Sequence, residues 1–200
     1  MKASDEQASL HYDVVIVGGA IMGASTAWFL TDNPDFNGSV LVIERDMTYE
    51  ACSTTHTNSC IRQQFSTELN VKISQFAADF IKNLRERMGA DDRIPKLSIH
   101  DFGYMYLANT KASADILRTN QMVQQTTGAG TQLMTASQIK AAYPFYWVDD
   151  IVLGSINTLD IMPGRHTHRT KLLSGLKQVR EFDGLIATHA RDRRGACQIR

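Results

Sequence analysis

Residues 12–23 read YDVVIVGGAIMG, and residues 40–44 read VLVIE. The first apolar run is rich in β-branched residues, as buried strands are, and a glycine turn leads from it into small residues typical of a helix. A second apolar strand ends in an acid about twenty residues beyond the turn. This order of strand, glycine turn, helix, strand and acid predicts a βαβ unit that binds a dinucleotide.

Each part of this motif has a physical role. Gly18 permits the sharp turn, Gly23 lets the helix lie close to the sheet, and free N–H groups at the helix start attract a pyrophosphate. Ala20 stands where the dinucleotide motif has its second glycine, and its methyl group is expected to weaken binding without preventing it. The candidate cofactor residues of this segment are Gly18, Gly19, Ala20, Met22 and Gly23.

Glu44 ends the second strand, where a carboxylate accepts hydrogen bonds from the ribose hydroxyls of an adenosine. The same charge repels a 2′-phosphate, so the pattern favours FAD or NAD over NADP. A transmembrane or signal segment over residues 14–30 is the alternative interpretation. It fits poorly, because the stretch contains three glycines and two hydroxyl residues and follows an acidic flank.

Composition sets further limits on the 200-residue chain. The counts of acids and bases are equal at 21 each, which gives no reason to expect a nucleic-acid partner. Three cysteines without a C-x-x-C pair indicate neither a disulfide framework nor a zinc site, so a reducing, cytoplasmic setting is expected. Residues 1–11 are expected to form a loose tail without a secretory signal.

Periodicity predicts further α/β structure up to about residue 155. A helix capped by Ser66 or Thr67 and stopped by Gly89 is expected to turn an apolar stripe toward the core. That stripe comprises Leu69, Ile73, Phe76, Ala77, Phe80, Leu84 and Met88. A strand over 103–108, helices over 111–127 and 137–142, and a strand over 152–156 follow.

Four segments together resemble a known family. They are the glycine motif, VLVIERD at 40–46, ACST at 51–54 and IRQQFS at 61–66. Over residues 12–155 the chain is similar to FAD-dependent oxidoreductases of the D-amino-acid oxidase, sarcosine oxidase and dimethylglycine dehydrogenase superfamily. The resemblance implies that Arg45 lies near adenine, that Ser53 and Thr54 contact the pyrophosphate, and that Arg62 lies near the isoalloxazine ring or the substrate.

The resemblance also implies a reaction. The family oxidises a C–N bond by moving a hydride from an amine or amino acid to the flavin, so FAD and a small-molecule amine or amino-acid substrate are expected. No catalytic residue, electron acceptor or metal is assigned. An NAD-dependent dehydrogenase and a non-catalytic nucleotide-binding fragment remain as alternatives.

The resemblance implies a Rossmann-like FAD-binding βαβ domain followed by the start of an α+β substrate-binding domain, in a truncated α/β chain. The expected segments are the tail over 1–11, the N-terminal part of the FAD-binding domain over 12–90, part of the substrate-binding domain over 91–155, and an atypical basic tail over 156–200. We expect no membrane span.

The basic tail holds nine Lys or Arg against four Asp or Glu, whereas residues 1–155 hold twelve against seventeen. Nothing in it resembles the return to the nucleotide domain that relatives make. Three interpretations of the tail remain open. It could form a metal site from His166, His168 and Cys197, contact nucleic acid or acidic lipid, or be an out-of-frame or disordered segment. We favour a shift of the reading frame near residue 158. Codons that can encode residues 159–163 would spell Gly-Tyr-Tyr-Ala in another frame, and this string is close to what relatives carry.

Overall fold

The structure is a computed structural model that describes residues 11–57, 60–90, 92, 97, 99–100, 103–160, 162–163, 186–191 and 197–199. It divides into two compact units. The first unit comprises Met1–His56, Asp92–Pro95 and Arg169–Arg200, and the second comprises Thr57–Asp91 and Lys96–His168. No helix among the described residues is long and apolar enough to cross a membrane.

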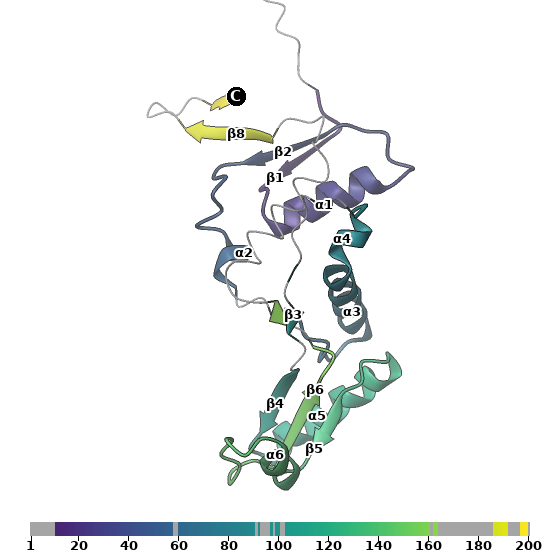
Figure 1. Ribbon diagram of the computed structural model, residues 1–200, viewed down its shortest axis with the longest axis vertical. Helices are drawn as coiled ribbons and strands as arrows, with labels where there is room; N and C mark the ends of the chain where they lie inside the picture. Colours follow the sequence, from purple (N-terminus) through teal and green to yellow (C-terminus); the bar gives the residue numbers. More distant parts are fainter. Residues whose placement is uncertain are drawn as a thin grey trace, which may run out of the picture. The chain divides into compact units, whose positions relative to one another are not determined.

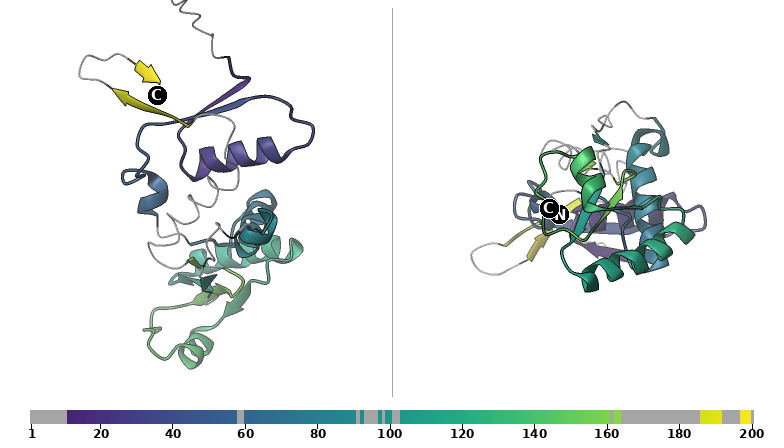
Figure 2. Two further views of the ribbon diagram at one scale, coloured as in Figure 1. Left: turned by 45° about the horizontal axis from the view of Figure 1, so that its top comes forward. Right: turned by 90° about the horizontal axis from the view of Figure 1, so that it is seen from below.

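The first unit contains the predicted βαβ motif (Figure 1). Strands β1 (Val14–Val17) and β2 (Val40–Glu44) are parallel, with Val14 opposite Val40, and helix α1 (Ile21–Asp32) connects them. Figure 2 shows α1 lying along one face of these strands. The buried core between them consists of Ala27, Val40 and Val42, against which Val14, Ile16 and Phe36 pack. The predicted strand, helix and strand are therefore confirmed.

The same sheet continues with a strand that the sequence analysis did not predict. Strand β8 (Ile186–Arg191) pairs parallel with β2, and β9 (Cys197–Ile199) pairs antiparallel with β8, which gives the order β1-β2-β8-β9. Residues 186–191 read IATHAR, with only two β-branched residues among small and basic ones, so their composition does not indicate a strand. Residues His166 and His168 of the hypothetical metal site lie outside the described residues.

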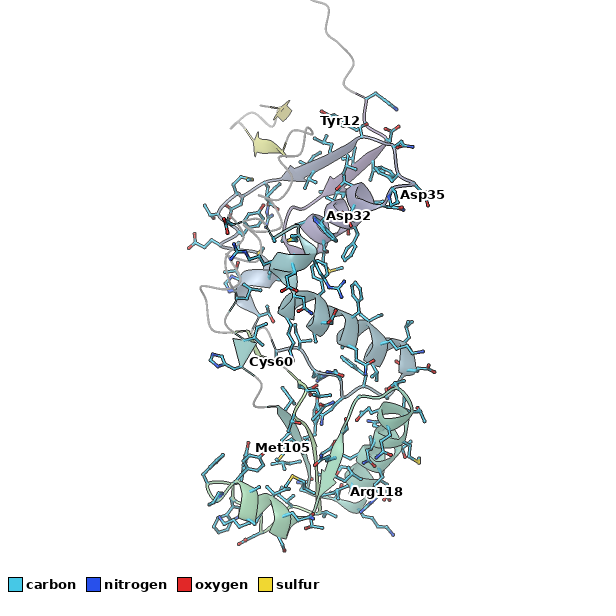
Figure 3. The ribbon with its side chains drawn as sticks, turned by 45° about the vertical axis from the view of Figure 1, so that its right-hand side comes forward. Tyr12, Asp32, Asp35, Cys60, Met105 and Arg118 are labelled. Atoms are coloured by element: carbon cyan, nitrogen blue, oxygen red, sulfur yellow. The ribbon has the colours of Figure 1, made fainter. Side chains whose placement is uncertain are left out.

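The second unit is built on an antiparallel sheet with the order β4-β6-β5. These strands are β4 (Tyr104–Ala108), β5 (Gln132–Met134) and β6 (Leu153–Asn157), and a separate small pair joins β3 (Ile99–His100) to β7 (Met162–Pro163). Helix α5 (Lys111–Thr126) covers a core of Ala108, Ala114 and Leu153. Figure 3 labels Met105 on β4 and Arg118 on α5.

The two helices predicted in this region begin within one residue of the expected positions, and each starts with a capping box that the sequence analysis did not identify. Thr110 caps α5 by accepting the N–H of Ser113, and Thr135 caps α6 (Ala136–Ala142) by accepting the N–H of Gln138. In each case the side chain of the third helical residue, Ser113 or Gln138, accepts the backbone N–H of the cap residue. These reciprocal bonds satisfy N–H groups that a helix start otherwise leaves unpaired.

The helix predicted to run to Gly89 differs from the expectation in two ways. It is divided at Asn83 into α3 (Glu68–Lys82) and α4 (Leu84–Arg87). The prediction that its stripe faces the core was wrong for Leu69, Ile73 and Phe76, which are 68%, 55% and 51% exposed. Helical spacing identifies an apolar face but not what covers it, and in this unit Val71 and Ala78 are the buried residues of α3.

The second unit begins at Thr57, well before the predicted domain boundary at residue 90. The reason is that the segment around α3 is bonded to the sheet region. Gln75 Nε2 donates to the carbonyl oxygen of Thr127 at 3.0 Å, and Gln124 Nε2 donates to that of Phe65 at 3.0 Å. Residues 60–90 therefore pack with the elements that follow them.

Gly23 is the tightest point of the βαβ motif, and its replacement tests that geometry. A Cβ atom at this position would lie 1.7 Å from the carbonyl oxygen of Gly18. We expect Gly23→Ala to lower the free energy of unfolding by about 3 kcal/mol, since neither backbone segment can yield easily. Thermal denaturation followed by circular dichroism measures this loss.

Gly128→Ala is the matched control. Gly128 has φ +75° but nothing within 4 Å of its Cβ position, so the substitution introduces backbone strain without overlap and should cost about 1 kcal/mol. Equal destabilisation by the two substitutions would show that the helix does not approach the turn this closely.

Candidate functional site

The glycine turn of the first unit has the geometry that a dinucleotide site needs. Gly18 has φ +101°, a left-handed conformation that favours glycine, and its N–H donates to the carbonyl oxygen of Ile43 at 2.7 Å. Ala20 has φ −68° and ψ −169°, which any residue adopts. The alanine that replaces the second glycine of the motif therefore causes no backbone strain.

The start of helix α1 carries no side-chain cap. Ala20 occupies the N-cap position without a side-chain hydrogen bond, and the first turn contains no acidic residue. The first N–H groups of a helix lack intrahelical partners and carry partial positive charge. A diphosphate fits this helix start, because no side chain of the helix competes for these donors.

Glu44 lies against the turn with its side chain buried. Its Oε2 accepts the N–H of Gly19 at 2.7 Å, and its Oε1 accepts the N–H of Asp46 at 2.9 Å. Each carboxylate oxygen retains a further lone pair for a ribose hydroxyl. The neighbouring Arg45 side chain is exposed. The predicted acid is thus beside the predicted turn, and its role toward a ribose stays a prediction.

Tyr49 is a buried residue of this site that the sequence analysis did not identify. It is 6% exposed and has φ 57°. Burial, with the nearby charge of Glu44, raises the pKa of its hydroxyl to about 12. No motif or periodicity marks a tyrosine in the loop after β2, so its position depends on the folded backbone.

Ser53 and Thr54 belong to the short helix α2 (Ser53–His56) of the same unit. The preceding Cys52 Sγ lies 3.3 Å from Thr55 Oγ1. Partial burial alone would raise the pKa of the Cys52 thiol, but hydrogen bonds from Thr55 and Thr54 outweigh burial and lower it. This loop therefore presents polar donors with little bulk, as a segment beside a phosphate chain requires.

Arg62 belongs to the second unit, whereas the other nine candidate residues belong to the first. Its guanidinium donates a hydrogen bond to the Tyr106 hydroxyl and lies 4.8 Å from the centre of the Phe65 ring. Among the residues that the structure describes, no carboxylate lies within ion-pair distance of Arg62. The cation is held by aromatic faces, so its charge remains available to an anion.

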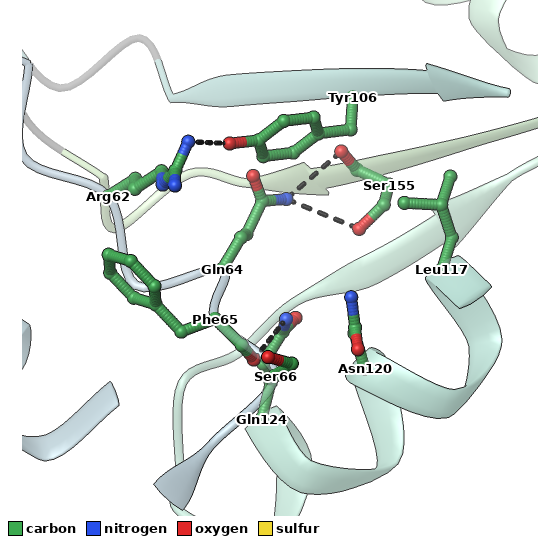
Figure 4. Close-up of a pocket in the computed structure, with 9 residues that line it drawn as sticks. All are labelled: Arg62, Gln64, Phe65, Ser66, Tyr106, Leu117, Asn120, Gln124 and Ser155. Carbon is green, nitrogen blue, oxygen red and sulfur yellow. Dashed lines mark hydrogen bonds between the residues drawn. The ribbon is translucent and has the colours of Figure 1, made fainter. Parts of the chain in front are cut away.

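Arg62 lines a cavity of about 250 Å³, shown in Figure 4. Gln64 Nε2 donates to the Ser155 carbonyl oxygen at 3.0 Å, and Gln124 Nε2 donates to that of Phe65. The Oε1 atoms of both glutamines are buried and accept no hydrogen bond from the described residues. The cavity therefore presents one cation, and none of the described residues that line it is acidic.

Asp160 fixes the segment that carries Arg62. Its Oδ1 accepts the N–H of Gln63 at 2.6 Å, while its buried Oδ2 has no hydrogen-bond partner among the described residues. Burial raises the pKa of this carboxyl to about 7, although the Gln63 hydrogen bond and the Arg62 charge act in the opposite direction.

The raised pKa of Asp160 makes stability depend on pH. The folded state binds this proton more tightly than the unfolded state, whose carboxyl has a pKa near 3.8. Stability is therefore lost as the pH rises through about 4 to 7, by an upper bound of about 4 kcal/mol. We expect Asp160→Asn to raise the melting temperature at pH 8 and to change it little at pH 4.

The exposed Asp149→Asn substitution is the control for this measurement, because Asp149 lies in the same unit. It should leave the melting temperature unchanged at both pH values. If Asp160→Asn had the same melting temperature as the wild type at pH 8, the claim that a buried carboxylate at Asp160 destabilises the fold would be contradicted.

Comparison with known proteins identifies relatives of the chain. The family model described as FAD dependent oxidoreductase matches residues 13–189. FAD-dependent oxidoreductase domain-containing protein 1 of Xenopus laevis is 39% identical over 147 residues, which cover 72% of this chain and 29% of that protein. Its counterpart from Bos taurus is 38% identical over 146 residues, which cover 72% of this chain and 30% of that protein. The chain therefore spans less than a third of the length of these relatives.

Solved structures share the fold. L-proline dehydrogenase from P. horikoshii has a TM-score of 0.69 and 22% identity, with 90% of this chain and 46% of that chain covered. L-α-glycerophosphate oxidase from Mycoplasma pneumoniae, solved with FAD bound, has a TM-score of 0.64 and 16% identity. The match covers 94% of this chain and 49% of that chain.

The family match passes residue 155 and includes most of β8, although the sequence analysis found no resemblance there. The reading-frame hypothesis stays a prediction. The expected superfamily, its α/β fold and its cofactor are confirmed by the family match and the shared fold. The chain belongs to the FAD dependent oxidoreductase family, whose members bind FAD.

Proposed function

We propose that this chain contains the dinucleotide-binding part of an FAD-dependent enzyme that oxidises the C–N bond of an amine or amino acid. The carboxylate of Glu44 against the N–H of Gly19, at 2.7 Å, is the observation that carries the proposal. It joins an acid to an uncapped helix start, which suits the ribose and diphosphate of one ADP group. When bound, FAD supplies an acceptor for a hydride.

The roles of the other candidate residues in this proposal are those that the family resemblance implies. Gly18, Gly19, Ala20, Met22 and Gly23 form the turn and helix start that receive the diphosphate. Arg45 lies toward the adenine, and the hydroxyl and backbone groups of Ser53 and Thr54 contact the pyrophosphate.

Arg62 binds the carboxylate of an amino-acid substrate in this proposal. Its guanidinium is oriented by the Tyr106 hydroxyl and by the Phe65 ring, so little side-chain entropy is lost when an anion binds. A carboxylate can accept two parallel hydrogen bonds from such a group. This cation gives an amino acid an advantage over an amine that lacks a carboxylate.

Cofactor binding is tested with Glu44→Gln. Loss of the negative charge weakens the hydrogen bonds to the ribose hydroxyls, so the dissociation constant for FAD should rise about tenfold. Titration of the apoprotein followed by flavin fluorescence measures it. Glu50→Gln, at an exposed site in the same unit, is the matched control and should bind as the wild type does. Tighter binding of NAD than of FAD would contradict the proposal.

Substrate recognition is tested with Arg62→Gln in the FAD-loaded protein. We expect amino acids to bleach the visible flavin absorbance anaerobically at least about tenfold more slowly than in the wild type, because a charge-assisted contact is lost. Simple amines should bleach both proteins at the same rate. Arg118→Gln, which removes an exposed cation on α5, is the control. Equal slowing with amines and amino acids would contradict carboxylate binding by Arg62, and no bleaching of the wild type would contradict C–N oxidation.

A further inference from the structure

The segment that carries Arg62 is fixed to β6 and to the turn that follows this strand. The Gln63 N–H donates to Asp160 Oδ1 at 2.6 Å. Gln64 Nε2 donates to the Ser155 carbonyl oxygen at 3.0 Å, as Figure 4 shows. These bonds hold the two residues that follow Arg62, so they also set the direction in which the Arg62 side chain leaves the backbone.

The Asp160 carboxyl is itself held in the interior of the second unit. Its own N–H donates to the Asn157 carbonyl oxygen at 3.3 Å, which closes the turn after β6. The Asn157 side chain is fully buried, and its amide donates to the Ala129 carbonyl oxygen and, at 3.3 Å, to Thr131 Oγ1. Asp160 is only 2% exposed, so water does not replace its bond to Gln63.

Asp160 interacts with Arg62 without reaching the cavity. The described residues that line the cavity include Arg62 and not Asp160, so the carboxyl does not contact an anion bound there. Burial raises the pKa of Asp160, and the positive charge of Arg62 partly opposes this rise. The two charges therefore interact, and an ionised Asp160 reduces the positive potential that Arg62 offers to an anion.

Two groups on neighbouring elements interact electrostatically with Asp160 in the described part of the chain. They are Arg62, in the segment before α3, and Tyr106, on β4. Burial raises the pKa of the Tyr106 hydroxyl, so this group stays neutral where Asp160 ionises. Arginine keeps its charge at any pH at which proteins are folded. Among these three groups, only Asp160 changes its charge near neutral pH.

We propose that Asp160 is the positioning residue of the Arg62 site, and that its neutral form is the one in which the cavity binds a carboxylate ligand best. The inference rests on the proposed function, in which Arg62 binds the carboxylate of an amino acid. Asp160 accepts the Gln63 N–H in either protonation state and so orients the segment in both. When Asp160 is neutral, the full charge of Arg62 is available to the ligand. When it is ionised, its charge opposes the ligand, so binding to the ionised form takes up a proton from the solvent.

The experiment measures the binding of propionate to the full chain by isothermal titration calorimetry at pH 6 and pH 8.5. Propionate carries a carboxylate and no amine, and it stays ionised at both pH values. We expect the dissociation constant of the wild type to rise about fivefold from pH 6 to pH 8.5, since the negative charge of Asp160 weakens binding. At pH 8.5, titrations in buffers of different ionisation enthalpy should show net proton uptake.

Asp160→Asn separates the charge of this residue from its hydrogen bond. Asparagine keeps an oxygen that accepts the Gln63 N–H and carries no charge. This variant should bind propionate equally at both pH values, with the affinity of the wild type at pH 6 and no proton uptake. A residue with a merely structural role would leave the pH dependence unchanged.

Asp160→Ala tests the positioning, because it removes both the charge and the acceptor. We expect its dissociation constant to be about tenfold higher than that of Asp160→Asn at both pH values, since the Gln63 N–H loses its partner. Asp149→Asn, at an exposed acid in the same unit, is the matched control. His100→Gln, on β3, controls for histidine charge, which in general changes over this pH range. Both control variants should keep the wild-type pH dependence.

The outcomes separate this role from the proposed function. Equal affinity of the wild type at both pH values, or a pH dependence that persists in Asp160→Asn, would overturn the inference. Asp160→Ala that binds as tightly as Asp160→Asn would overturn the positioning of the segment. Failure of the proposed function gives a different result, in which Arg62→Gln binds propionate as the wild type does or the wild type does not bind it. The role of Asp160 would then fall with the Arg62 site.

Discussion

The contact between the Glu44 carboxylate and the N–H of Gly19 brings together three features that are separated in the sequence. The parallel pairing of β1 and β2 places the end of each strand at the same edge of the sheet, and the turn after β1 leads directly into α1. An acid at the end of β2 therefore faces the helix start across the turn. This arrangement puts a negative charge beside partial positive charges, and a nucleotide with a diol and a diphosphate complements both.

The same contact has an energetic consequence for binding. Both oxygens of Glu44 already accept backbone N–H groups, so a ribose adds hydrogen bonds to a carboxylate that is held in place. Little reorganisation is then needed when the ligand arrives, and preorganised groups lose less entropy on binding. In the second unit the arrangement is different. Arg62 is oriented by aromatic rings and has no ion-paired acid among the described residues. Gln64 and Gln124 keep buried oxygens to which no described residue donates, which lowers stability.

Local patterns made the βαβ motif, α5, α6, β4 and β6 predictable. Glycines and apolar periodicity are properties of a few neighbouring residues. The capping boxes at Thr110 and Thr135 are equally local, although the sequence analysis did not identify them. The sequence did not show the side of α3 that is buried, the pairing of β8 with β2, or the position of Tyr49. Each of these depends on contacts between distant segments. The two glutamines that line the Arg62 cavity also lie sixty positions apart, and no spacing rule connects them.

The sheet of the first unit shows why parallel strands need partners on both faces. Helix α1 covers the face of β1 that bears Val14 and Ile16, whereas Val15 and Val17 on the opposite face are 51% and 84% exposed. Parallel sheets are normally covered on both faces, because their apolar strands otherwise contact water. Any element packed on this face would bury both valines. Burial of such side chains contributes roughly 2 kcal/mol each, so the stability of this unit depends strongly on what covers β1.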